Sequence, residues 1–277
     1  MKKNNGQIIF FACLSIVFLA MAILIAIAYT RKPLEFTFDA AYNQCVKSYD
    51  GNPWRYEELP TGHKYYLYLP EDYRKDKDNE DAKIPLIVVF HGSCEKAAAL
   101  KYGRFFISED FQKKIYPKGA AVLATMSRID YYTDPASMSL LIQNVVLKNK
   151  CIDPTNIIGY GFSQGAKFVA EVACKEPRLF RGIICGSGFY QMSAREILSI
   201  LPVSVYWATS ENDKGIFEQS YKTGRRCGFL CRNSRYIQYK SRWHFYVELK
   251  DETGKKLKNP DRNETMQDWL ISVVNRR

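Results

Sequence analysis

Residues 157–166 read Ile157-Ile158-Gly159-Tyr160-Gly161-Phe162-Ser163-Gln164-Gly165-Ala166. The apolar start is typical of a buried strand, and the two glycines that flank Ser163 favour a tight turn. Apolar residues then recur at the spacing of one helix face, at Ala166, Val169, Ala170 and Ala173. Pro177 ends that pattern. The stretch therefore predicts a strand, a turn and a helix, in that order.

The centre of this stretch, residues 161–165, has the Gly-x-Ser-x-Gly pattern that is typical of a nucleophile elbow. In such a turn the hydroxyl of Ser163 stands clear of the sheet, and the glycines let neighbouring backbones pass closely. The amide of Gln164 would lie at the helix N-terminus, where it can stabilise an oxyanion. The alternative is an ordinary turn in which Ser163 only caps the helix.

Apolar runs on both sides of this stretch predict further strands, at 64–69, 84–90, 120–126, 182–185, 203–208 and 235–240. Amphipathic spacing predicts helices within 101–118, 138–145 and 266–273. The charged stretch 74–83 is expected to be a loop. Strands that alternate with helices predict the α/β class, with an open, mostly parallel sheet covered by helices on both faces.

The domain organisation follows from the same patterns. No repeat and no interior linker divides the chain of 277 residues, so we expect one large domain over 62–277. Residues 31–61 are expected to form a lead-in segment, either irregular or an edge hairpin. Residues 1–30 form a separate N-terminal segment.

That N-terminal segment is apolar from Ile8 to Ala28, with Ser15 as its one clearly polar residue. Its length matches a helix that crosses a bilayer, and Lys2 and Lys3 before it favour a cytoplasmic N-terminus. Ala26-Ile27-Ala28 also resembles a cleavage site of a signal peptide. The long apolar run favours a retained transmembrane anchor over a cleaved signal peptide. Either interpretation places the rest of the chain outside the cytoplasm, membrane-anchored or secreted.

Cysteine usage agrees with export. Seven cysteines follow Cys13, and in an oxidising compartment some of them are expected to be bridged, with at least one left unpaired. Cys227 and Cys231, in a stretch rich in glycine and arginine that we expect to be a loop, are candidates for a local disulfide. Zinc is the alternative, but no second Cys/His pair with ligand spacing accompanies them.

The charge balance is basic, with 40 Lys and Arg against 29 Asp and Glu. Such a balance can favour anionic membrane surfaces or acidic polymers. The basic residues are dispersed and no nucleic-acid motif is present, so the sequence indicates a solvated basic surface and no nucleic-acid partner.

A serine hydroxyl is a weak nucleophile and needs a base, for which histidine is the usual choice. The chain has three histidines. His63 precedes a strand and fits a surface or packing role, whereas His91 ends a buried strand and would shape the loop that follows it. His244 follows a strand and is the only histidine after Ser163, so it is the candidate base, although it can also be a packing residue.

The base in turn needs a carboxylate that holds its tautomer. The strand at 203–208 leads into two acids, Glu211 and Asp213, at the edge where the crevice of a parallel sheet lies. Asp213 is the first choice and Glu211 the alternative, and each can instead be a solvated loop acid. The resulting order along the chain is Ser…Asp…His.

Four blocks carry a resemblance to a known family: Tyr66-Leu67-Tyr68-Leu69-Pro70, Pro85-Leu86-Ile87-Val88-Val89-Phe90-His91-Gly92, Ile152-Asp153-Pro154-Thr155-Asn156-Ile157 and the pentapeptide at 161–165. Together they resemble α/β-hydrolases of the esterase type. The likeness is closest to the polyhydroxybutyrate depolymerase/feruloyl esterase-like group, with an elbow similar to that of the carboxylesterase/acyl-protein thioesterase group. It covers the chain from about Gly62 onward.

The resemblance implies an α/β-hydrolase fold and a serine hydrolase that cleaves carboxylic esters through an acyl-enzyme. Ser163 would be the nucleophile, Asp213 the orienting acid and His244 the base, and the oxyanion hole would be the backbone amides of Ser93 and Gln164. No metal or organic cofactor is expected. The substrate would be a small-molecule or polymer-linked ester, and the membrane would be reached through the N-terminal helix.

The sequence also departs from the family pattern. Ala166 stands where a third glycine is common, the acid lacks the usual Gly-x-x-Asp setting, and no glycine-rich lead-in precedes His244. These departures keep Glu211 open as the acid. They also leave two other functions open, a peptidase or amidase of the same fold and a catalytically silent binding protein.

Overall fold

The computed structural model describes residues 4–29, 54–59, 61–75, 83–93, 98–127, 132–239, 256–259 and 261–276. Its centre is an eight-stranded sheet with the strand order β1-β2-β4-β3-β5-β6-β7-β8. The strands are β1 (Trp54–Glu58), β2 (Lys64–Tyr68), β3 (Ile84–Phe90), β4 (Ala121–Met126), β5 (Ile152–Phe162), β6 (Gly182–Gly186), β7 (Ser204–Ser210) and β8 (Arg235–Tyr239). β1 and β2 run antiparallel to their neighbours, and the six strands β3 to β8 are mutually parallel. The predicted α/β class is confirmed.

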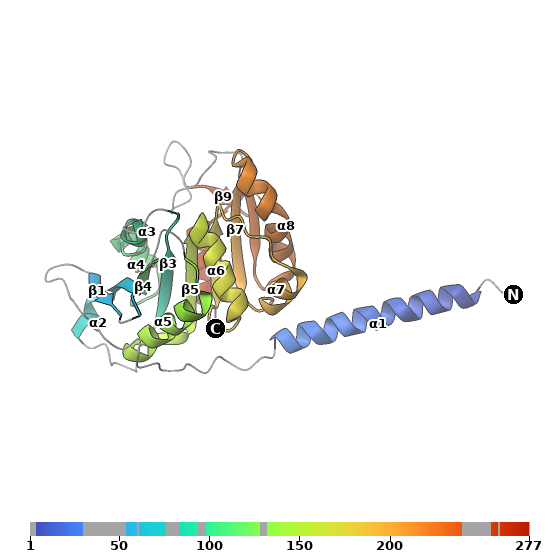
Figure 1. The fold of residues 1–277 in the computed structure, drawn as a ribbon, viewed down its shortest axis with the longest axis horizontal. Coiled ribbons are helices and arrows are strands. Elements are labelled where there is room, and N and C mark those ends of the chain that lie inside the picture. The colour runs from blue at the N-terminus through green and yellow to red at the C-terminus, as the bar shows by residue number, and fades with distance from the viewer. Residues whose placement is uncertain are drawn as a thin grey trace.

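Helices cover both faces of the sheet (Figure 1). One layer holds α5 (Pro135–Lys148), α6 (Gln164–Lys175), α7 (Ala194–Ser199) and α8 (Lys214–Leu230). The other holds α3 (Ala98–Phe106), α4 (Glu109–Ile115) and α9 (Met266–Val274). A short helix, α2 (Glu71–Lys75), precedes β3, and β9 (Lys258–Asn259) pairs with β10 (Glu264–Thr265) before α9.

The central strand β3 shows why its apolar run is continuous. All seven of its residues are buried. Leu86 and Val88 pack in the core beneath α5 and α6, whereas Ile87 and Val89 pack in the core beneath α3, α4 and α9. Successive side chains of a strand point to opposite faces, so a strand covered on both sides must be apolar at every position.

β1 lies inside the segment 31–61 and pairs with β2 as an antiparallel hairpin at the sheet edge, which is one of the two forms expected for that segment. The elbow strand begins earlier than expected, since Pro154-Thr155-Asn156 in the sequence favours a turn before the apolar run. β5 begins at Ile152, so Pro154 lies inside the strand and not in a turn before it. The pairing with β3 shifts register between Ile84 and Leu86, and this irregularity lets a proline fit into a strand.

The stretch around Cys227 is helical, which corrects the expectation of a loop. It forms the last turns of α8. A β-carbon on Gly224 would lie 2.4 Å from the ring of Tyr236 in β8, and one on Gly228 would lie 2.8 Å from the same residue. These glycines let α8 approach the sheet closely, which is a packing requirement that sequence composition does not separate from a turn.

The predicted disulfide between Cys227 and Cys231 is absent. The structure describes six cysteines, and none of these forms a disulfide: Cys13, Cys151, Cys174, Cys185, Cys227 and Cys231. The Cys227 sulfur is turned into the core, 3.9 Å from the sulfur of Met192, while Cys231 caps the helix four positions later. Cys45 and Cys94 lie outside the described residues.

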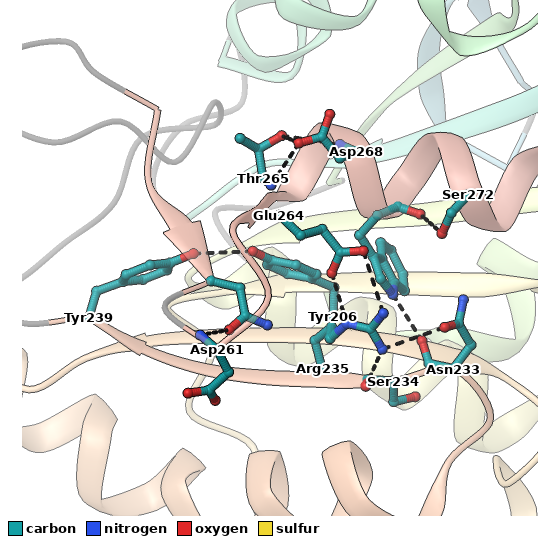
Figure 2. Close-up of polar contacts among 12 residues, drawn as sticks. Tyr206, Asn233, Ser234, Arg235, Tyr239, Asp261, Glu264, Thr265, Asp268 and Ser272 are labelled. Atoms are coloured by element: carbon teal, nitrogen blue, oxygen red, sulfur yellow. Dashed lines mark hydrogen bonds and ion pairs between the residues drawn. The ribbon is translucent and has the colours of Figure 1, made fainter.

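Contacts at the β7–β8 edge of the sheet hold α9 and the segment before it in place (Figure 2). The indole Nε1 of Trp269 donates to the carbonyl of Asn233, 2.9 Å away, and the Arg235 guanidinium at the start of β8 pairs with Glu264 at 2.8 Å. The hydroxyls of Tyr206 in β7 and Tyr239 in β8 lie 3.1 Å apart.

The end of α9 is tied to the start of two inner strands. The side-chain amide of Asn156 in β5 donates to the carbonyl of Val274 at 2.9 Å. Arg181, which directly precedes β6, donates to the carbonyl of Arg276 at 2.9 Å. α9 is therefore an integral part of the sheet packing.

The N-terminal segment forms one helix, α1 (Asn4–Tyr29). Its window Phe10–Ile27 has a mean hydropathy of 2.9, and none of that window is buried. By length and composition the helix can cross a membrane, and a signal sequence has the same properties.

Candidate active site

Ser163 lies at the junction of β5 and α6 in a strained backbone conformation. Its φ is 55° and its ψ is −117°, a region that residues with a β-carbon rarely adopt. Its amide donates to the carbonyl of Gly186 at the end of β6, 2.9 Å away, which holds the turn against the sheet. A strained serine at the end of a central strand is what the Gly-x-Ser-x-Gly pattern predicts.

The two glycines of the pentapeptide are required by space. A β-carbon on Gly161 would lie 2.1 Å from the carbonyl oxygen of Gly165. A β-carbon on Gly165 would lie 2.5 Å from the carbonyl oxygens of both Phe90 and His91. The first turn of α6 is therefore pressed against the backbone at the ends of β5 and β3.

Ala166 stands where related elbows commonly have a glycine, and its side chain fits because it faces Gly188. A β-carbon on Gly188, just past β6, would lie 2.9 Å from the β-carbon of Ala166. Gly188, in the loop after β6, therefore leaves the space that the side chain of Ala166 occupies.

Both candidate oxyanion donors lie at this edge of the sheet. β3 and β5 are neighbours, with Phe90 paired to Gly161, so the loop after β3 that contains Ser93 begins beside the elbow. Gln164 is the first residue of α6 and is buried. The positions of Ser93 and Gln164 therefore fit the roles expected of their amides.

His91 fixes the loop after β3, in agreement with the sequence interpretation. Its ring is fully buried, with Nδ1 2.6 Å from the Gly92 carbonyl and Nε2 3.2 Å from the Ser127 amide. A carbonyl only accepts and a backbone amide only donates, so Nδ1 carries the proton and Nε2 accepts. Nε2 thus connects the end of β3 to Ser127 directly after β4, and Nδ1 holds the loop after β3 through the Gly92 carbonyl.

Tyr132 is a further residue of this region that no sequence pattern indicates. Its ring stacks on Phe168 of α6, with centroids 4.7 Å apart, and lies 4.6 Å from the ring of His91. Its hydroxyl accepts from the His91 amide at 3.2 Å and donates to the Thr125 carbonyl at 3.0 Å. Burial raises the pKa of Tyr132 well above its usual range, so the hydroxyl keeps its proton. Nothing singles this residue out among 19 tyrosines.

Gln164 connects Tyr132 to the elbow. The side-chain oxygen of Gln164 accepts from the Tyr132 amide at 3.4 Å, and its nitrogen donates to the Tyr132 carbonyl at 3.2 Å. The residue after Ser163 therefore carries a backbone amide suited to an oxyanion and a side chain that fixes the segment leading into α5.

Tyr132→Phe is expected to lower the free energy of unfolding by about 1–3 kcal/mol, because the buried His91 amide and Thr125 carbonyl each lose a hydrogen-bond partner. Urea unfolding followed by circular dichroism measures the change. Tyr221→Phe is the matched control, since its hydroxyl bonds an exposed Arg225 and water can replace it. Equal effects of the two substitutions would contradict the role given to Tyr132.

The two candidate acids both follow β7 but differ in their contacts. The Glu211 carboxylate accepts from the side-chain amide of Gln238 in β8 at 2.6 Å, and the Glu211 amide donates to Tyr239. Asp213 is buried at the N-cap of α8, and its side chain makes no capping hydrogen bond there. Glu211 is thus bound to the neighbouring strand, whereas the buried Asp213 carboxylate does not serve the helix end.

The other two histidines, His63 and His244, differ in whether the structure describes them. His63 precedes β2, and three strand spacings of about 4.8 Å separate β2 from β5, so it lies on the order of 14 Å from the elbow. Its Nδ1 lies 3.0 Å from the hydroxyl of Thr61. His244 lies outside the described residues, five positions beyond the end of β8. Ser163, Gln164, Ser93 and the two acids thus share one edge of the sheet, and the base remains a prediction.

Comparisons with known proteins agree with this fold. No protein-family model matches the chain, and the comparison with curated proteins found no match. A thermostable esterase matches with a TM-score of 0.55 at 18% identity, over 80% of this chain and 60% of that one. A ferulic acid esterase matches with a TM-score of 0.50 at 11% identity, over 74% and 90%. FphF, a fluorophosphonate-binding serine hydrolase of Staphylococcus aureus, matches with a TM-score of 0.50 at 11% identity, over 68% and 91%.

At these identities the likeness concerns the fold. The chain has the α/β-hydrolase fold, which confirms that part of the resemblance seen in the sequence. It spans less than two thirds of the length of the thermostable esterase.

Proposed function

We propose that the protein is a serine hydrolase that cleaves carboxylic esters through an acyl-enzyme. The observation that carries the proposal is the conformation of Ser163, with φ at 55° between two glycines that no larger residue can replace without a backbone shift. The backbone of Ser163 is strained, and because such strain is concentrated at functional sites, it supports Ser163 as the nucleophile. The esterases and serine hydrolase that share the fold support the same chemistry.

In the proposed reaction, Ser163 Oγ attacks the ester carbonyl while His244 takes its proton. The amides of Ser93 and Gln164 donate to the oxyanion of the tetrahedral intermediate. The intermediate collapses, the proton moves from His244 to the departing alcohol, and the acyl group stays on Ser163. Water, deprotonated by His244, then releases the acid and restores the serine.

The assignment of His244 as base is supported by the contacts of the other histidines. Both ring nitrogens of His91 have structural partners, and His63 lies across three strand spacings from the elbow. A base on the loop after β8 would also meet an acid on the loop after β7, because β7 and β8 are parallel neighbours.

Asp213→Asn is expected to lower the rate of ester hydrolysis by roughly 10³- to 10⁴-fold, because an amide cannot stabilise the imidazolium of the base. Glu211→Gln is the matched control and is expected to lower the rate less than about tenfold, since its carboxylate is held by Gln238. Initial rates on p-nitrophenyl acetate measure both. The reverse order of effects would assign the acid to Glu211.

The direct test of the function is covalent labelling of the folded full chain by a fluorophosphonate probe, with mass analysis of the modified peptide. We expect one modified residue, Ser163. A folded protein that takes up no label contradicts the proposal and favours a catalytically silent binding protein. A panel of p-nitrophenyl esters and aminoacyl-anilides then separates an esterase from a peptidase or amidase, since leaving-group preference depends on the shape of the pocket.

We further propose that α1 is a retained membrane anchor and that the hydrolase domain lies outside the cytoplasm. The support is the length and apolarity of α1 and the basic residues before it. Cell fractionation with N-terminal sequencing tests this, and a mature chain that begins after Ala28 would show a cleaved signal peptide.

A further inference from the structure

The exposed large apolar side chains outside α1 gather at one edge of the sheet. Within the described residues they are Leu147, Leu198, Phe229 and Leu230. Each lies in the last turn of a helix in the layer formed by α5 to α8, and each precedes the next parallel strand by five or six positions. They therefore lie at the amino ends of the parallel strands. Phe229 is the most prominent, with 88% of its surface exposed.

Basic residues surround these side chains. The segments that lead into β5, β6, β7 and β8, each a helix end with the loop after it, are residues 147–151, 175–181, 198–203 and 225–234. Their sequences hold eight basic residues and one acidic residue, the half-buried Glu176. Six of the basic side chains are exposed: Lys150, Lys175, Arg178, Arg225, Arg226 and Arg232. We call these segments the amino-edge surface. Residues 76–81, before β3, hold four acidic residues and one basic residue in their sequence and lie outside the described residues, so they are not part of this surface.

The end of α8 shows how the two kinds of residue combine. Arg225 and Arg226 lie one turn before Phe229 and Leu230, and Arg232 follows them. The Arg232 amide donates to the Leu201 carbonyl at 2.8 Å, which holds this end of α8 against the segment after α7. Basic residues beside exposed aromatic and aliphatic residues are the combination that binds the interface of an anionic bilayer.

We propose that the amino-edge surface docks on a bilayer that contains anionic phospholipids. Charge complementarity selects anionic headgroups, and Phe229 and Leu230 would enter the boundary between headgroups and acyl chains. α1 is the second observation that points to a membrane, because it is long and apolar enough to cross one. A chain anchored by α1 would keep its domain at a high local concentration near the lipid.

Docking in this way would give the domain one orientation. Ser163 lies at the carboxyl end of β5, whereas the amino-edge surface lies at the opposite ends of β5 to β8. The elbow would therefore face water. The proposal concerns lipid binding and does not depend on the reaction at Ser163.

The test uses the full chain in lipid nanodiscs, either of phosphatidylcholine alone or of phosphatidylcholine mixed with phosphatidylglycerol. Amide hydrogen exchange read by mass spectrometry is expected to slow in peptides covering 225–234 and 147–151 in the mixed discs. Added salt should reverse the protection, because it screens exposed charges.

Variants make the test specific. Each basic residue near an anionic surface raises the binding constant for the membrane about fivefold. Arg225→Glu/Arg226→Glu is therefore expected to remove the protection from hydrogen exchange. Phe229→Ser is expected to weaken it. Arg104→Glu/Lys113→Glu makes the same charge change on α3 and α4, in the opposite layer, and should leave the protection intact.

Three results would overturn the proposal: equal exchange in the two kinds of disc, protection of 161–166 in place of the amino edge, or an equal loss in the control variant. Fluorophosphonate labelling in the same discs reports on Ser163 separately. A failure of lipid docking therefore remains distinguishable from a failure of the proposed reaction.

Discussion

Ser163→Ala is expected to abolish labelling by a fluorophosphonate and to lower the rate of ester hydrolysis by roughly 10⁴- to 10⁶-fold. The substitution removes Ser163 Oγ, the proposed nucleophile, and leaves the proposed oxyanion donors, the amides of Ser93 and Gln164, in place. Alanine keeps the β-carbon, so the backbone strain at φ 55° is unchanged and the free energy of unfolding should change by less than about 1 kcal/mol. The measurements are gel fluorescence of the labelled protein and initial rates on p-nitrophenyl acetate.

Ser187→Ala is the matched control for this prediction. Ser187 is a second serine with positive φ, at 51°, and it lies in the buried segment directly after β6, whose last residue accepts the Ser163 amide. We expect Ser187→Ala to retain labelling. Labelling that persists in Ser163→Ala and disappears in Ser187→Ala would move the nucleophile and contradict the proposed site.

Gly161→Ala is expected to lower the free energy of unfolding by about 3 kcal/mol or more and to inactivate the protein. The new β-carbon would lie 2.1 Å from the Gly165 carbonyl oxygen and 2.6 Å from the Ala166 nitrogen. Both atoms belong to the backbone of the first turn of α6, so the clash can be removed only if the start of the helix moves away from the sheet. That movement would displace Ser163 and the Gln164 amide together. Urea unfolding and fluorophosphonate labelling measure the two effects.

Gly215→Ala is the control for this second substitution. Gly215 lies in the first turn of α8, and a β-carbon there would meet no atom within 4 Å. Alanine has the higher helix propensity, so we expect a gain of about 0.5–1 kcal/mol with no loss of labelling. A loss of stability in both variants would mean that these glycines are sensitive for a reason other than the close approach at the elbow.

The sequence predicted the elbow and the alternation of strands and helices because both rest on local patterns. The apolar run of β3 and the glycines around Ser163 are read within a few residues, and the structure confirms what they indicate. Tyr132 could not be predicted in this way. Its role depends on His91, Thr125 and Gln164, which reach it from three different elements.

The glycines of α8 show a second limit of sequence reasoning. Gly224 and Gly228 were interpreted as loop residues, since glycine has a low helix propensity. The structure places them in α8, where Tyr236 of β8 occupies the space that larger side chains would need. A long-range contact therefore explains why these helical positions are glycine. The contact between Glu211 and Gln238 likewise joins residues that the sequence separates, so the sequence alone left Glu211 open as an alternative to Asp213.

The attachment of α9 bears on when the domain can fold during its synthesis. The carbonyls of Val274 and Arg276 accept hydrogen bonds from Asn156 in β5 and from Arg181 just before β6. Asn156 and Val274 are 118 positions apart, so α9 leaves the ribosome long after the strands to which it is bound. The inner strands can pair with one another early, but these two contacts and the burial of Trp269 and Val273 have to wait for α9. The final packing of the sheet is therefore expected only once synthesis has passed residue 276.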